Sequence, residues 1–244
     1  MSLENLEKLY LSICKKKPNK KSLNALLKYP DRQKIIDFLS SKLSGFIKYE
    51  SDCFSGDDEW GIIHSVKILG DLRAVESIEL LIKIMDMVKN DPLVILYSYT
   101  IIALPKMGEP ALEHVYKMYL KDRSNSEFRY VWLSVLANLG VKDTRIYNAI
   151  ALHFEADPVE TVNLMGGYGD KSFLPVVKLF VNTIAAALNA KKINPFEYGI
   201  RFRVPEAEAY IETREDWILL ETGLSFRSEE FKRKVKELDN LDNS

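Results

Sequence analysis

The side chains best suited to catalysis or metal binding in this chain are three histidines and two cysteines, and the sequence scatters them. His64, His114 and His153 are 50 and 39 residues apart, without the H-E-x-x-H pair or Cys/His cluster that a zinc site requires. Cys14 and Cys53 have no histidine beside them in the sequence, so no thiol nucleophile with an adjacent base is visible. We therefore predict packed or surface histidines, no metal site and no cofactor.

Two further segments look like ligand sites but lack essential residues. The Gly166–Gly169 stretch has no predicted strand before it and no Gly-Lys-Ser/Thr after it, as a phosphate-binding loop would need. An acidic segment lacks the D-x-D-x-D-G order of a calcium loop, and carboxylates just before Trp60 are better explained as a helix start. Its members are Glu50, Asp52, Asp57, Asp58 and Glu59. No catalytic constellation is visible, and we predict that the chain is not an enzyme.

Charge is balanced overall but uneven along the chain. The 244 residues contain 34 Lys+Arg and 35 Asp+Glu, and a net charge of −1 makes general nucleic-acid binding unlikely. Residues 1–48 hold eleven basic and four acidic side chains, so they carry +7 and residues 49–244 carry −8. The densest basic cluster is Lys15, Lys16, Lys17, Lys20 and Lys21, around the turn at Pro18-Asn19. It is either a weak contact for phosphate, an anionic membrane or an acidic partner, or a solvated helix corner.

The sequence also bears on the compartment. No apolar run reaches the roughly 18 residues of a membrane span. The first eight residues carry acidic side chains where a secretory signal would be basic. Two cysteines in a chain of this length are typical of a reducing environment. We expect a soluble, cytoplasmic protein without a transmembrane segment.

An internal repeat organises the middle of the chain. Each of four glycines has apolar residues four positions and one position before it, the stripe of a helix near its end; they are Gly70, Gly108, Gly140 and Gly169. We predict that each glycine ends a helix in the left-handed conformation and that a following acid caps the next helix. These acids are Asp71, Glu109, Asp143 and Asp170. Spacings of 38, 32 and 29 residues fit a pair of antiparallel helices per unit.

Three segments carry a resemblance to a known family. Leu69-Gly70-Asp71 followed by Arg73-Ala74-Val75 resembles the corner of HEAT and PBS-lyase HEAT-like repeats. The stretch 128–140 is similar to the family's first helix, with Arg129 at its arginine position, and 165–170 matches more weakly. The resemblance implies an all-α fold, an α-α superhelix of about four to five antiparallel helix pairs.

The sequence departs from this pattern at several positions. Trp132 and Thr100 replace a small alanine of the first helix, and Pro105 interrupts the second copy, so we expect an irregular solenoid. We predict a helical N-terminal cap at 1–57, HEAT-like repeats at 58–189, and a C-terminal extended arm with helices at 190–244. Apolar and polar residues alternate over 196–204, which predicts either an arm laid on the last repeat or an edge strand that pairs with another chain.

The function follows only from the resemblance. It implies that second helices line a concave face, and we expect their polar side chains to form a groove for a partner protein, although an ordinary solvated face is the simpler explanation for any one of them. The candidate groove is Glu79, Lys83, Asp86, Glu113, Lys117, Tyr147, Asn148, Lys178 and Asn182. We therefore expect a non-catalytic scaffold or regulator. The alternatives are a HEAT-like DNA glycosylase, which the negative repeat region disfavours, and a PBS-lyase-like chromophore lyase or chaperone.

Overall fold

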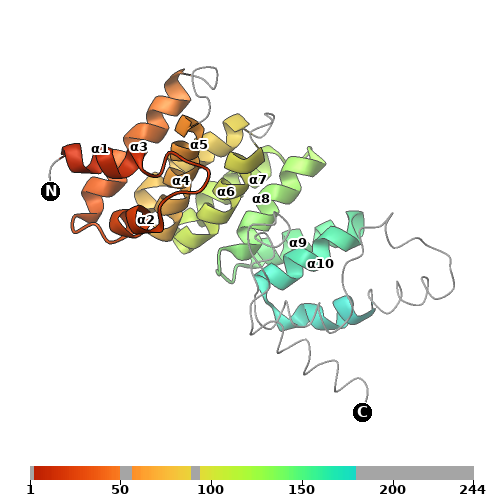
Figure 1. Cartoon of the computed structure of the whole chain (residues 1–244). Helices are drawn as coiled ribbons and strands as arrows, with labels where there is room; N and C mark the ends of the chain where they lie inside the picture. The colour runs from red at the N-terminus through yellow and green to blue at the C-terminus, as the bar shows by residue number, and fades with distance from the viewer. Residues whose placement is uncertain (1–2, 50–56, 89–93, 180–244) are drawn as a thin grey trace, which may run out of the picture. The chain divides into compact units, whose positions relative to one another are not determined.

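The computed structural model describes residues 3–49, 57–88 and 94–179 (Figure 1). Within these ranges the regular elements are α-helices and short 3-10 helices, without a β-strand, so the predicted all-α class is confirmed there. The strand predicted at 196–204 and the helices predicted after it lie outside the described residues. The chain divides into two compact units, Met1–Phe128 and Arg129–Ser244, and each is described by itself.

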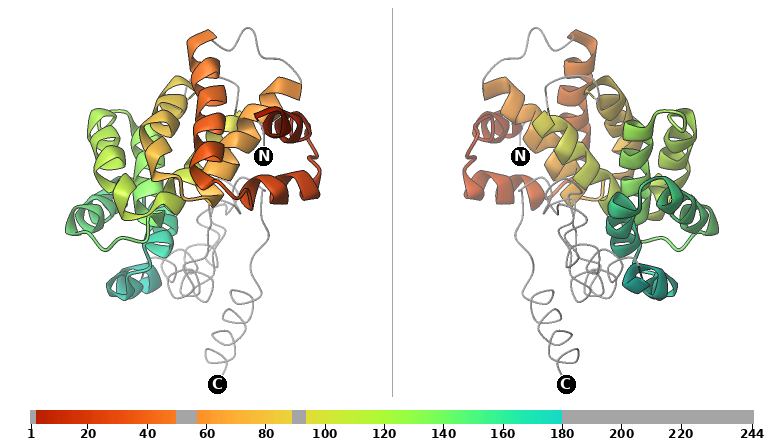
Figure 2. Two further views of the ribbon diagram at one scale, coloured as in Figure 1. Left: turned by 90° about the vertical axis from the view of Figure 1, so that its left-hand side faces the viewer. Right: turned by 90° about the vertical axis from the view of Figure 1, so that its right-hand side faces the viewer.

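The first unit contains helices α1 to α7 and the first turn of α8. Their bounds are α1 Leu3–Leu11, α2 Lys20–Leu27, α3 Arg32–Tyr49, α4 Asp57–Asp71, α5 Ile78–Val88, α6 Val94–Ala103 and α7 Leu112–Lys121. The first three helices fall within the predicted N-terminal cap. Figure 2 shows α1 and α2 joined by a loop at the outer edge of this unit.

Local hydrogen bonds explain where these helices start. The Asn19 side chain accepts a bond from the Lys21 backbone N–H at 2.9 Å, at the start of α2. The Asp31 side chain accepts one from the Lys34 backbone N–H at 3.0 Å, so the predicted cap of α3 is confirmed. Such caps satisfy N–H groups that have no partner within the helix. The acidic segment also begins a helix as predicted, because α4 starts at Asp57.

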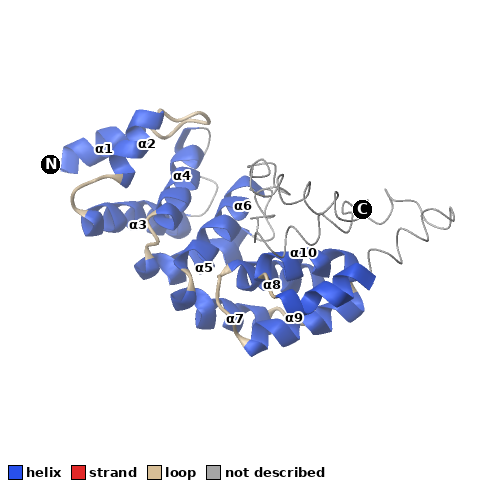
Figure 3. Cartoon of the chain, turned by 90° about the horizontal axis from the view of Figure 1, so that it is seen from below, coloured by secondary structure: helices blue, strands red, loops and turns tan. Residues whose placement is uncertain are grey.

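The helices of the first unit pack in two layers. One layer has α2 beside α4 and α4 beside α6, while the other has α3 beside α5 and α5 beside α7 (Figure 3). The side chains between them include fully buried Leu39 and Leu43 of α3, Ile63 and Val66 of α4, and Leu81 of α5. Each such side chain contributes about 1.5–3 kcal/mol relative to an exposed one, so these apolar stripes hold the layers together.

Both layers repeat with the same offset along the chain. In one layer Asp71 Oδ1 accepts a bond from Lys106 Nζ at 2.7 Å, and in the other Asp86 Oδ2 accepts one from Lys121 Nζ at 2.9 Å. Both pairs are separated by 35 residues. The helix pair α4–α5 therefore recurs as α6–α7 after 35 residues, rather than after the 38 that separate the marker glycines.

A longer second corner explains this difference. Pro105 follows the end of α6, and the chain continues through two 3-10 helices, Leu104–Met107 and Glu109–Ala111. Proline cannot donate the hydrogen bond that would extend an α-helix. Gly108 between the two turns has the predicted positive φ, 68°. Glu109 lies inside the second turn, and α7 starts after Ala111 without a side-chain cap, so the predicted capping role of Glu109 is wrong.

The first corner also departs from prediction. Helix α4 continues through Gly70 to Asp71, and the left-handed residue is Arg73, with φ of 51°. A Cβ atom on Gly70 would lie 2.8 Å from both the Cα and Cβ of Ala103, so this glycine permits α4 to approach α6 closely. The predicted roles of Gly70 as a helix terminator and of Asp71 as a cap are wrong. Asp71 is the last residue of α4 and binds two lysines instead.

In the second unit the corners follow the prediction. Its elements are α8 Ser126–Asn138, which starts just before the division, α9 Thr144–Ala156, α10 Pro158–Tyr168 and a 3-10 helix Lys171–Phe173. Gly140 and Gly169 have φ of 78° and 65°. The side chain of Asp143 caps α9 through the Arg145 N–H at 2.7 Å, and Asp170 caps the 3-10 helix in the same way. Glycine and acid therefore divide the work of ending one helix and starting the next.

Candidate functional site

Five of the predicted groove residues lie on two neighbouring helices of the first unit, α5 and α7. On α5, Leu81 and Met85 are buried, and the intervening side of the helix presents Glu79 and Lys83 to solvent. The period of 3.6 residues separates these two faces, because residues four apart share one side of a helix. The same pattern on α7 buries Val115 and Tyr119 and exposes Glu113 and Lys117.

Two contacts between α5 and α7 fix how these helices are aligned. His114 Nδ1 lies 4.0 Å from Glu79 Oε1, and Lys121 Nζ donates to Asp86 Oδ2 at 2.9 Å. Each contact joins residues 35 apart, and the two contacts are seven residues apart on both helices. The helices therefore run parallel and in register. His114, Lys121 and their contacts were not predicted, because they depend on this register.

The register groups the charged side chains by sign. Glu79 and Glu113 lie at nearly the same level, and Lys83 and Lys117 lie together about one turn further along. All four side chains are exposed. We call this set the α5–α7 face. Side chains of like charge at neighbouring positions repel one another weakly, so this arrangement does not stabilise the packing of the two helices.

Asp86 and Leu120 mark the end of the α5–α7 face. Asp86 is partly buried and bound to Lys121, so it holds the two helices together more than it faces solvent. Leu120, one turn beyond Lys117, is 48% exposed. The sequence analysis missed this leucine, although its position seven residues after Glu113 is the signal that would have found it.

The remaining predicted groove residues lie in the second unit or outside the description. Tyr147 on α9 stacks on Phe173, with ring centroids 4.5 Å apart, so its ring serves the packing of this unit. Asn148 on α9 is exposed, as is Lys178 in the helical residues 174–179. Asn182 lies outside the described residues. The structure therefore brings together the first five members of the predicted groove, and the others are described within their own unit.

The histidines divide as predicted into packed and surface residues. His64 and His153 are only 4% and 6% exposed, whereas the His114 side chain is 44% exposed. Burial lowers the pKa of His64, against the hydrogen bond to the Lys15 carbonyl, which raises it. Burial also lowers the pKa of His153, and the charge of Arg129 adds to the effect. Among the described residues no group of three or more His, Cys, Asp or Glu side chains is arranged to hold a metal ion.

Comparisons with protein-family models, curated proteins and solved structures find no match to this chain. In the part of the chain that the structure describes, no helix is both long and apolar enough to cross a membrane.

Proposed function

We propose that this protein is a non-catalytic, cytoplasmic scaffold or regulator that binds a partner protein on the α5–α7 face, as part of a HEAT-like solenoid. The observation that carries the proposal is the parallel register of α5 and α7, which sets an exposed pair of glutamates beside an exposed pair of lysines. The repeat offset of 35 residues and the two layers of the first unit support the solenoid part of the proposal.

Mixed charge favours a protein partner over a polyanion. A nucleic acid would gain from Lys83 and Lys117 but would be repelled by Glu79 and Glu113 within the same face. A partner helix with basic residues opposite the glutamates and acidic residues opposite the lysines would instead be attracted at both rows. Such complementarity sets specificity and the rate of association.

Leu120 supplies an apolar contact at one end of this face. At 48% exposure it already lies partly against neighbouring side chains, and a partner would remove the rest of its surface from water. Interfaces commonly combine an apolar centre with charged residues at the rim. We therefore expect the partner to cover Leu120 together with the lysine pair.

Charge reversal tests the proposal directly. The full-length protein and a Lys83→Glu/Lys117→Glu variant would be used to capture proteins from lysate of the source organism, with quantitative mass spectrometry. The matched control is Lys20→Glu/Lys21→Glu, which changes the net charge by the same amount on exposed lysines elsewhere in this unit. Any candidate partner would then be purified and its Kd measured against all three proteins.

We expect a stoichiometric partner whose Kd rises at least about tenfold in the Lys83/Lys117 variant and remains unchanged in the control. A Leu120→Ser variant should weaken the same complex. A partner lost only in the Lys20/Lys21 variant would contradict the proposed site. Release of alkylated purines from DNA by the purified protein would contradict the proposed function and favour a glycosylase.

A further inference from the structure

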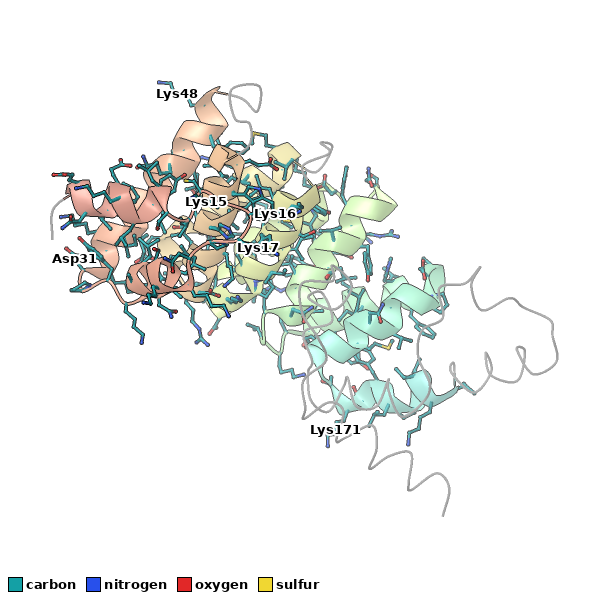
Figure 4. All side chains as sticks on the ribbon, viewed as in Figure 1. Lys15, Lys16, Lys17, Asp31, Lys48 and Lys171 are labelled. Atoms are coloured by element: carbon teal, nitrogen blue, oxygen red, sulfur yellow. The ribbon has the colours of Figure 1, made fainter. Side chains whose placement is uncertain are left out.

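The loop between α1 and α2 presents the densest positive charge of the chain on a defined surface. We call Lys15, Lys16, Lys17, Lys20 and Lys21 the basic corner, and all five are exposed. Within the described residues none of the five forms an ion pair. Figure 4 shows Lys15, Lys16 and Lys17 on the loop that passes in front of α4.

The loop is held against α4 by buried contacts. Ile13 and Cys14 are 0% and 4% exposed, and the Cys14 thiol donates to the Tyr10 carbonyl at 3.3 Å. On the α4 side, His64 Nε2 lies 3.1 Å from the Lys15 carbonyl oxygen. A Cβ atom on Gly61 would be 2.6 Å from Cys14 Sγ, so the glycine makes room for the loop. The lysines therefore extend from an anchored backbone.

Nearby acidic side chains do not neutralise the corner. On α1, Glu4 accepts from Lys8 at 2.7 Å and Glu7 accepts from Lys42 at 2.9 Å, so both glutamates are engaged with other lysines.

The position of the corner on α2 also disfavours positive charge. Lys20 and Lys21 are in the first turn of α2, where the positive end of the helix dipole disfavours cations. The folded chain thus gathers five like charges at an unfavourable place. An anionic partner would relieve this repulsion.

The chemistry of the segment distinguishes among anionic partners. Residues 11–21 contain neither arginine, which binds phosphate through two parallel hydrogen bonds, nor an aromatic ring on which a base could stack. They begin instead with Leu11, which ends α1 and is 62% exposed. Lysines beside an exposed aliphatic side chain are the combination that binds the surface of a negatively charged bilayer.

We propose that the basic corner docks the protein on an anionic lipid surface, with Leu11 entering the headgroup region. This contact is separate from the α5–α7 face and does not depend on the protein partner proposed for it. The contrast between +7 in residues 1–48 and −8 in the remainder favours contact through this corner alone.

Vesicle co-sedimentation of the full chain tests this proposal. Phosphatidylcholine vesicles with 30% phosphatidylserine would be compared with pure phosphatidylcholine at about 0.1 M salt, where the Debye length is about 10 Å. One variant replaces the five corner lysines by Gln. The control replaces five exposed lysines elsewhere, so that the net charge changes equally: Lys48, Lys83, Lys117, Lys171 and Lys178.

We expect binding only to the anionic vesicles, weakened at least about a hundredfold in the corner variant and at most severalfold in the control, because each lysine near the surface changes partitioning roughly fivefold. Leu11→Ser should weaken binding about tenfold or less, with an unchanged circular dichroism spectrum. Equal loss in both five-lysine variants would overturn the proposed corner. So would full binding by the corner variant, or tighter lysine-dependent binding to a single-stranded oligonucleotide than to vesicles.

Discussion

The two units close their helix corners by different chemistry. In the first unit, charged side chains do most of this work: Asp71 binds Lys67 at 2.6 Å and Lys106 at 2.7 Å. The Arg32 guanidinium donates to two carbonyl oxygens at the end of α4, those of Leu72 and Arg73, both at 3.1 Å. Burial alone would raise the pKa of Asp71, but the two lysines outweigh it and lower that pKa below its ordinary value.

In the second unit, aromatic rings replace the ion pairs. The Tyr168 hydroxyl accepts from the Asp143 N–H at 3.0 Å and donates to the Asp143 carbonyl at 3.1 Å. Lys142 Nζ lies 4.3 Å from the centre of the Tyr168 ring and donates to its backbone carbonyl. Burial raises the pKa of Tyr168, although the bond to Asp143 opposes this, so the hydroxyl stays protonated and can donate.

This comparison teaches that the same turn can be held by interactions with different strength and salt dependence. Partly exposed ion pairs each contribute about 0–1 kcal/mol and are screened by salt. A buried tyrosine that joins apolar contact to two hydrogen bonds contributes several kcal/mol and responds little to salt. We therefore expect the second unit to depend on one residue and the first to depend on many.

Removing the Tyr168 side chain should have the largest effect. Tyr168→Ala is expected to lower the free energy of unfolding of the second unit by about 3–5 kcal/mol, because it leaves a cavity and deprives Asp143 of two bonds. Hydrogen exchange read by mass spectrometry should show loss of protection in α9 and α10. Tyr168→Phe keeps the ring and should lose only about 1–2 kcal/mol. Equal protection in wild type and Tyr168→Ala would refute the dependence on this residue.

Gly70→Ala should have the next largest effect, in the first unit. Its new methyl group would lie 2.8 Å from the backbone of Ala103, and forcing α4 and α6 apart is expected to destabilise this unit by about 1–3 kcal/mol. Gly45→Ala is the matched control, because a Cβ there meets nothing within 4 Å and helical alanine is favoured over glycine by about 0.5–1 kcal/mol. Urea denaturation should therefore move in opposite directions for the two variants.

Asp71→Asn should produce a smaller, salt-dependent loss. It removes the charge that both lysines bind, and we expect a loss of about 1 kcal/mol or less in the first unit at low salt. Since salt screens the wild-type ion pairs, the difference from wild type should shrink at 1 M NaCl, where the Debye length is about 3 Å. A loss that is independent of salt would show that Asp71 acts through packing.

The pH dependence should be the smallest and most gradual effect, and it should be alike in both units. His64 and His153 each have a pKa below the ordinary 6.5, so the unfolded chain binds more protons once the pH falls through 6.5. The free energy of unfolding should consequently decrease from pH 7.5 to 5.5. Urea denaturation at the two pH values measures this, and His64→Gln/His153→Gln should reduce the slope. Stability that rises on acidification would contradict the buried, neutral state of these histidines.

Local signals made part of the fold predictable. Gly108, Gly140 and Gly169 were recognised as left-handed because few other residues adopt that conformation easily. Gly70 was misassigned because its reason lies outside its own segment: Ala103, 33 residues later, requires a residue without a side chain. Local sequence could not reveal which of these two roles the fourth glycine has.

The candidate site divides in the same way. Exposure of Glu79, Lys83, Glu113 and Lys117 followed from helical periodicity alone. The grouping of like charges depended on the register of α5 and α7, which the extra 3-10 turns of the second corner determine. Sequence spacing counted from the marker glycines gave 38 residues instead of 35, so it could not pair Asp86 with Lys121.

Site-specific photo-crosslinking tests the central claim, the partner contact on the α5–α7 face, most directly. A photoreactive phenylalanine analogue would replace Lys83, Lys117 or, as a control in the other unit, exposed Lys171, and the proteins would be irradiated in source lysate. The account predicts one covalent adduct of the same mass from Lys83 and Lys117, containing the same protein, and none from Lys171. Adducts of that protein from Lys171 alone, or no specific adduct from either face position, would contradict it.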